Sequence, residues 1–232
     1  ALLNSRDEQS SLNAIQLMNQ ELLNTGWQLA KHESFHDYLV PGGNFNYNQL
    51  APIAAVARVA EASGAVVIPA RDSRTLTIKA RYPVKPWQRA TAAADKQLSY
   101  AQVDSVDGEF IQAKRYNGVH VAGNSSDGHL VHTTRAGTNG TPALEVTVDP
   151  LITAPIAGHS RGLALLGATG KRIMHSLVTG VYSGMNDPGI FEPCELVSVM
   201  VSNTESYQAM VTGVAIRAAW EGGEVVSDTL IT

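Results

Sequence analysis

The sequence has few of the residues that mark secreted, membrane or nucleic-acid-binding chains. Cys194 is the only cysteine, so no disulfide can form within the chain. The net charge of −4 at pH 7 gives no basic surface of the kind that grips nucleic acid. No run of about 18 apolar residues is present, and the first residues lack a basic-then-apolar pattern. Neither a membrane span nor a signal peptide is therefore predicted.

The composition describes a folded chain with a sparsely charged surface. Apolar residues make up 44% of the 232 positions, which is enough to bury a core. Charged residues make up only 16%, below the roughly 25% of an average domain, and this favours burial of much of the surface in an assembly. Cys194 lies between acidic residues with no activating cation beside it, so we interpret it as a packing thiol.

Residues 1–90 are predicted to form an α+β lobe. Apolar residues recur at helical spacing in 10–24 and in 49–63, and Gly64 follows the second segment as a C-terminal stop signal. Residues 27–40 are predicted to be extended or irregular. The alternating segments 65–69 and 75–79 predict a β-hairpin.

Residues 91–232 are predicted to form a second lobe, a small β-barrel with one packed helix at 157–167. Two prolines in 81–87 predict a stiff linker, which places the domain boundary near residue 90. Residues 221–227 are predicted to form a final turn and edge. The predicted strands are short and bounded by Gly, Asn or Ser: 109–116, 118–122, 129–135, 144–148, 173–182, 195–202 and 209–220. The fold class predicted for the whole chain is α+β.

One motif suggests an enzyme. Residues 158–162, Gly-His-Ser-Arg-Gly, match the nucleophile elbow of α/β-hydrolases, in which Ser160 would be the nucleophile. That mechanism needs an acidic residue and then a histidine after the serine. Only His175 follows Ser160, and no Asp or Glu lies between them. We therefore interpret the motif as a helix start in which Gly158 and Ser160 act as caps, and predict no catalytic residue.

Two histidine groups and one glycine pair are candidate binding sites. His32, His36 and Asp37 lie close together, as do His129 and His132, but neither group has a further ligand at a diagnostic spacing. If 129–135 is a strand, the second pair points to opposite faces. Gly137 and Gly140 lack the Gly-Lys-Ser/Thr of a phosphate loop. The prediction is no metal and no cofactor.

A receptor- or carbohydrate-binding module is the other alternative. Trp27, Trp87 and Trp220 are the candidate stacking platforms for such a module. The competing interpretation is that these tryptophans anchor the core or the linker. Hydrolase, binding module and structural protein thus remain three separate hypotheses at this point.

Several segments together resemble the phage tail hub family, the baseplate-hub or tail-tip proteins. In the first lobe they are TGW at 25–27, YLVP at 38–41, NFNY at 44–47, PIAAV at 52–56, AEASGA at 60–65 and ARYPVKPW at 80–87. In the second they are YNGVHVAG at 116–123 and GIFEPCELV at 189–197. None of them is a catalytic signature.

The resemblance implies a non-enzymatic structural protein of the virion, assembled in the bacterial cytoplasm. It implies a homotrimeric ring that caps the tail tube, with the tube protein, the tape measure and tip or spike proteins as partners. DNA would only pass through the lumen. The family often has a further tube-like lobe that is not found here, so the chain is either a fragment or a departure from the pattern. The apolar segment 197–201 is predicted to be an edge that partner chains cover.

Overall fold

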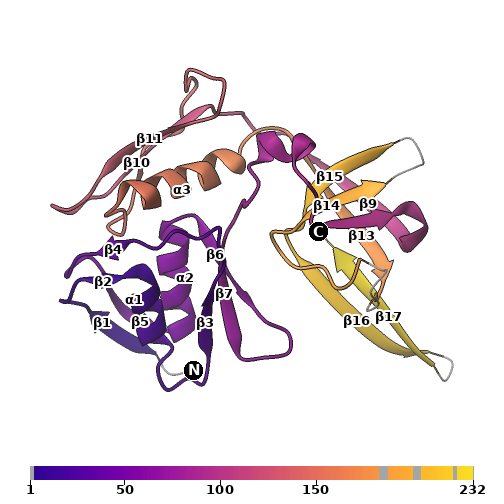
Figure 1. Cartoon of the computed structure of the whole chain (residues 1–232), viewed down its shortest axis with the longest axis horizontal. Helices are drawn as coiled ribbons and strands as arrows, with labels where there is room; N and C mark the ends of the chain where they lie inside the picture. The colour runs from indigo at the N-terminus through magenta and orange to yellow at the C-terminus, as the bar shows by residue number, and fades with distance from the viewer. Residues whose placement is uncertain (1–2, 183–187, 201–204, 222–223, 232) are drawn as a thin grey trace. The chain divides into compact units, whose positions relative to one another are not determined.

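The computed structural model describes residues 3–182, 188–200, 205–221 and 224–231, with the backbone alone for 219–221 and 224–231. The backbone divides into two units (Figure 1). Unit 1 comprises Ala1–Pro83 and Arg115–Thr169, and unit 2 comprises Val84–Lys114 and Gly170–Thr232. The chain first passes from unit 1 to unit 2 between Pro83 and Val84, inside the segment 81–87 that was predicted to be a linker. The predicted lobes, 1–90 and 91–232, were continuous, whereas each observed unit is built from two separate segments.

Two helices in unit 1 confirm the predicted ones, with shorter bounds. Helix α1 (Ala14–Glu21) begins after Asn13, whose backbone amide donates to the Gln16 side chain at 2.9 Å. Helix α2 (Pro52–Ala62) has its proline in the first turn, where no amide is needed. It is followed by Gly64 at φ +70°, a conformation that glycine adopts without strain.

Short strands surround these helices. Strands β6 (Ala65–Pro69) and β7 (Thr75–Ala80) form the predicted hairpin, and β3 (Gln28–Lys31) joins β7 in parallel. Strand β1 (Asn4–Asp7) pairs with β5 (Asn46–Leu50), and β2 (Leu12–Asn13) pairs with β4 (Leu39–Val40). The core between them includes the buried side chains of Leu17, Met18, Phe45, Val56, Val59 and Ile78.

The second segment of unit 1 is a small sheet with a helix on one face. Strand β10 (Gly118–Ala122) lies between β11 (Leu130–Thr134) and β12 (Thr147–Val148). Helix α3 (Pro155–Gly167) runs along this sheet (Figure 1). Leu151 and Ala157 join the core of α1 and α2. The predicted helix 157–167 therefore exists, but it packs within unit 1 and not on a barrel of residues 91–232.

Unit 2 consists of two sheets on a common core. One has the order β16 (Val214–Glu221), β17 (Glu224–Ile231), β13 (Arg172–Gly180), β9 (Val103–Ile111). The other has the order β15 (Ser206–Met210), β14 (Leu196–Met200), β8 (Lys96–Ser99). Short 3₁₀ helices occupy Pro86–Thr91 and Tyr100–Gln102. The core side chains are Leu98, Leu177, Phe191, Val197, Val199 and Val211.

The α+β class is confirmed, while the barrel is not: among the described strands, no sheet closes on itself. Several strand predictions also need correction. The predicted strand 209–220 is the end of β15 and most of β16, which residues 211–213 separate. Residues 224–227 belong to β17, an inner strand paired on both sides. Strand β14, predicted to be an edge, is central in its sheet, and Val201 and Ser202 lie outside the described residues.

Candidate assembly surface

Ser160 lies inside α3 and not at a strand-to-helix turn. The helix begins at Pro155 with Ala154 as its N-cap, so neither Gly158 nor Ser160 caps it, and the capping prediction is wrong. His159 has its Nδ1 3.4 Å from Thr133 Oγ1. His175 lies in β13 of unit 2, where its ring stacks on Tyr207 at 4.8 Å. The motif therefore lacks the local geometry of a nucleophile elbow.

The two glycines of the motif have a packing role instead. A Cβ at Gly158 would lie 2.7 Å from Val131 Cγ2, and a Cβ at Gly162 would lie 2.5 Å from Thr133 Oγ1. Both distances are too short for a side chain to be added without a shift of the structure. Four residues apart on one face of α3, these glycines let the helix approach β11 closely.

We expect Ser160→Ala to leave the protein nearly unchanged, because Ser160 is an interior helix residue without a capping bond and alanine favours helices. The free energy of unfolding should change by less than about 0.5 kcal/mol. Urea unfolding measures this change, and hydrolysis of a p-nitrophenyl ester by both proteins tests the enzyme hypothesis. Ester hydrolysis that disappears in the variant, or stoichiometric labelling of Ser160 by a serine-directed probe, would contradict the structural interpretation.

The histidine groups form no metal site in the described part of the chain, where no cluster of three or more His, Cys, Asp or Glu residues is found. His32 Nδ1 lies 2.9 Å from Ser34 Oγ. The Asp37 carboxylate accepts from the backbone amides of Ile15 and Tyr38, so it caps α1 from outside. His129 precedes β11, and its amide donates to Ile152 O at 3.1 Å.

The remaining candidate residues lie at separate places. Trp27 is half-exposed in unit 1, Trp87 is half-buried in the 3₁₀ helix of unit 2, and the side chain of Trp220 lies outside the described residues. Cys194 is buried, and its amide donates to Val211 O at 2.8 Å. Gly137 and Gly140 have positive φ values and form the predicted loop after β11.

Strand β9 is a long and exposed strand of unit 2. It is an edge strand that pairs only with β13 among the described strands, and its residues from Asp104 to Phe110 are all exposed. The other edge of the same sheet is β16. A long edge strand offers unpaired backbone amides and carbonyls, to which another chain can add a strand. The sequence placed a strand at 109–116 and so missed most of this edge.

Strand β9 has an apolar side and an acidic side. Phe110 lies opposite Ile173, and Val106 lies opposite Leu177 on the same face of the sheet. Leu177 is buried in the core, whereas Phe110, Ile173 and Val106 are 59%, 56% and 54% exposed. The face of β9 and β13 that points to the core is therefore covered at Leu177 and exposed at the other three residues. Asp107 and Glu109 alternate with these residues and point to the other face.

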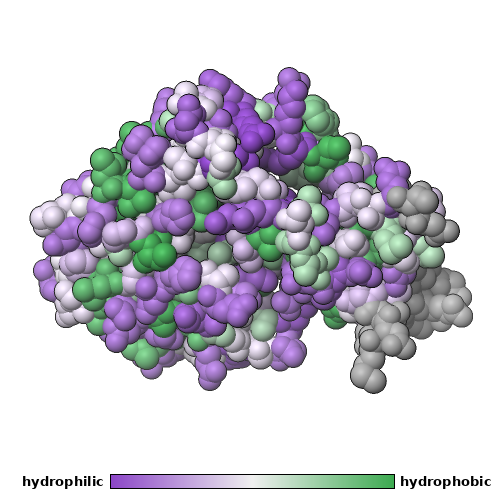
Figure 2. Space-filling view, turned by 45° about the horizontal axis from the view of Figure 1, so that its top comes forward, coloured by the Kyte–Doolittle hydropathy of each residue, from purple (hydrophilic) through white to green (hydrophobic). Residues whose placement is uncertain are grey.

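On the face drawn in Figure 2, hydrophobic residues form small patches separated by hydrophilic ones. Small patches are normal on a soluble surface. We therefore define the candidate assembly surface as the β9 edge with Val106, Phe110 and Ile173.

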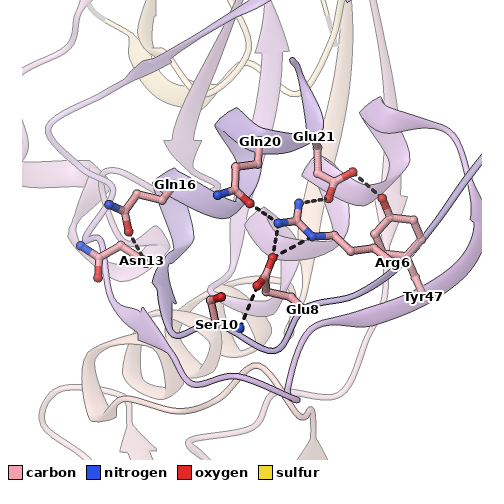
Figure 3. A network of polar contacts seen from close by, with 8 residues as sticks. All are labelled: Arg6, Glu8, Ser10, Asn13, Gln16, Gln20, Glu21 and Tyr47. Carbon is pink, nitrogen blue, oxygen red and sulfur yellow. Dashed lines mark hydrogen bonds and ion pairs between the residues drawn. The ribbon is translucent and has the colours of Figure 1, made fainter. Parts of the chain in front are cut away.

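A network of polar side chains holds the N-terminal strand of unit 1 (Figure 3). Arg6 donates to Glu21 Oε1 at 2.6 Å, and it also bonds to Glu8 and Gln20. The Tyr47 hydroxyl donates to the other oxygen of Glu21, and Ser10 N donates to Glu8 Oε1 at 2.8 Å. Glu21 is a buried carboxylate on α1. The network ties β1 and β5 to α1, and no sequence pattern indicated that these distant residues meet.

The network also fixes the charges of its members. The hydrogen bond from Arg6 lowers the pKa of Glu8. Burial opposes the charge on Arg6, but its bonds to Glu8 and Glu21 outweigh that effect and raise its pKa. Burial, together with the bond to Glu21, raises the pKa of Tyr47. Arg6 and Glu8 are thus ionised and the Tyr47 phenol is neutral at pH 7. These are the states that the hydrogen bonds between them require.

Three solved structures with a similar fold are those of tail proteins. A tail protein from Neisseria meningitidis matches with a TM-score of 0.61 and 9% identity, over 99% of this chain and 68% of that one. The tail protein of prophage MuSo2 from Shewanella oneidensis matches at 0.55 and 13%, over 98% and 67%. A prophage tail protein from Listeria monocytogenes matches at 0.56 and 15%, over 98% and 67%. At these identities the likeness concerns the fold.

No protein-family model matches the chain, and no curated protein matches it significantly. Among the described residues no helix is long and apolar enough to cross a membrane. The three similar structures show that the fold is that of phage and prophage tail proteins. This agrees with the sequence resemblance as far as a tail protein is concerned.

Proposed function

We propose that this chain is a structural component of a phage or prophage tail, located at the hub or tip where it caps the tail tube. The observation that carries the proposal is the likeness of fold to tail proteins over nearly the whole chain. The low charged fraction and the open β9 edge support a role in an assembly. The helical setting of Ser160 supports a structural role over a hydrolytic one.

In this proposal the chain forms a ring with three-fold symmetry. Strands β9 and β16 are opposite edges of one sheet, so one edge of a subunit can meet the other edge of the next. Such a head-to-tail contact is heterologous and closes into a ring when the rotation fits. A stable contact of this kind buries more than about 1,000 Å².

The proposed partners follow from the position of the ring. The tail tube protein would lie on one side and tip or spike proteins on the other, with the tape measure inside and DNA in passage through the lumen. Three copies of unit 2 fill three of the positions around a six-fold tube. A second strand-rich lobe, from the same polypeptide or a partner, would fill the others. The complex would reside in the virion after assembly in the bacterial cytoplasm.

We expect native mass spectrometry and light scattering at micromolar concentration to find a trimer, alone or after addition of the tube protein of the same particle. Phe110→Asp should shift the trimer to monomer, because it places a charge in the apolar part of the candidate assembly surface. Leu23→Asp is the matched control: Leu23 is exposed in unit 1, and its substitution should leave the mass unchanged. A protein that stays monomeric or dimeric under both conditions contradicts the proposal.

A further inference from the structure

Two histidine rings stack on the outer face of the small sheet in unit 1. His120 on β10 and His132 on β11 are directly opposite in the antiparallel register. Their ring centroids are 4.2 Å apart and the planes differ by 8°. Val131 and Thr133, which alternate with His132, lie against Gly158 and Gly162 of α3, so the stack lies on the opposite face of the sheet.

The geometry does not suit a metal ion. The lone pairs of an imidazole lie in the plane of its ring, and two nearly parallel rings direct them along parallel planes and not toward one point. No third His, Cys, Asp or Glu completes a cluster here in the described ranges. The arrangement is that of two stacked imidazole rings.

Apolar and small residues flank the stack on its own strands. Along β11 the neighbours on this face are Leu130, which is 71% exposed, and Thr134. Along β10 they are Gly118 and Ala122. The loop after β11 contributes Gly140, where a Cβ would lie 3.3 Å from two atoms of the His132 ring. None of these residues carries a charge.

The charged residues near the sheet are engaged elsewhere or exposed. Arg135 follows β11, is buried, and donates to Leu166 O of α3. Asp149 follows β12 and accepts from the amide of Leu151, and Asp127 in the turn before β11 contacts Ser126. Glu145 precedes β12 and is exposed. Within the described structure no carboxylate forms an ion pair with either ring of the stack.

We propose that the His120–His132 stack makes the pairing of β10 with β11 sensitive to acid. The pairing is stable when the rings are neutral and is weakened when both rings are protonated. Like charges directly opposite on neighbouring strands destabilise a sheet. Two charges about 4 Å apart repel even in water, and more strongly where solvent is partly excluded. Protonation of both rings therefore opposes the pairing of β10 with β11 at this point of the sheet.

The test compares the pH dependence of stability in matched variants. Wild type, His120→Gln, His132→Gln and the double variant are unfolded with urea at about pH 7.5 and about pH 5, on either side of the histidine range. Wild type should lose on the order of tenfold more of its folding equilibrium constant on acidification than any of the three variants. The variants should resemble one another, because each lacks the repelling pair.

Two further variants separate the stack from other titrations. His132→Phe keeps an aromatic ring on His120 but takes no proton, so it should show the small acid loss of the glutamine variants. His36→Gln removes an exposed histidine elsewhere and should behave as wild type. Amide hydrogen exchange of β10 and β11 in wild type, corrected for intrinsic pH dependence, locates the effect without any substitution. Equal acid sensitivity in wild type and His132→Phe, or unchanged protection of these strands at the lower pH, overturns the proposal.

Discussion

Gly64→Val is expected to lower the free energy of unfolding by about 3 kcal/mol or more, through backbone strain and steric overlap together. Gly64 has φ +70°, where a β-branched residue is strained. A Cβ there would lie 2.7 Å from the carbonyl oxygen of Ser160 and 3.0 Å from Arg161 Cα. These are backbone atoms of α3, which cannot move without moving the helix. Urea unfolding followed by circular dichroism measures the loss.

Gly43→Val is the matched control for this substitution. Gly43 also has a positive φ, +86°, but nothing lies within 4 Å of a Cβ built on it. Its substitution should show only the backbone strain, about 1–2 kcal/mol. The difference between the two variants therefore measures the contact between the end of α2 and α3. Equal losses would mean that α3 does not pack against Gly64 in solution.

That contact explains why the helices were predicted well and the division of the chain was not. Helix α2 is set by local signals, Pro52 at its start and Gly64 after its end, which can be read from neighbouring residues. Helix α3, which lies about a hundred residues later in the sequence, packs directly against the same Gly64. Arg161 of α3 also donates to Glu61 O at 2.8 Å. No local pattern encodes this docking, so 115–169 was assigned to the second lobe by continuity.

The same limit applies to the candidate sites. The glycines at 158 and 162 were recognised as a motif, but their purpose depends on Val131 and Thr133, which lie opposite them only in the folded state. Strand alternation predicted β10 and β11 correctly, yet the pairing of His120 with His132 depends on the register of the hairpin. Residue types were visible in the sequence, whereas the partners of each residue were not.

Glu21→Ala is expected to lower the free energy of unfolding by about 3 kcal/mol, the lower end of the cost of breaking a buried ion pair. Glu21 accepts from Arg6 and Tyr47, and its side chain is only 3% exposed. Its loss leaves the Tyr47 hydroxyl and one Arg6 nitrogen without their acceptor. Arg6 keeps Glu8 and Gln20, which places the estimate at the lower end. Urea unfolding gives the size of the effect, and amide exchange shows whether α1 and β1 lose protection first.

Two further variants serve as controls for this prediction. Glu33→Ala removes an exposed carboxylate of the same unit and should change stability by less than about 0.5 kcal/mol.

The triple variant Arg6→Met, Glu21→Leu, Tyr47→Phe replaces Glu21 and both of its partners with apolar side chains. It should recover part of the loss, because a buried polar group is costly chiefly when its partner is missing, and only Glu8 and Gln20 then lose their bonds to Arg6. If Glu21→Ala is as mild as Glu33→Ala, the network of Figure 3 does not hold the N-terminal strand. If the triple variant is less stable than Glu21→Ala, the network contributes net stability beyond satisfying its own members, and β1 depends on these charges for its place against α1.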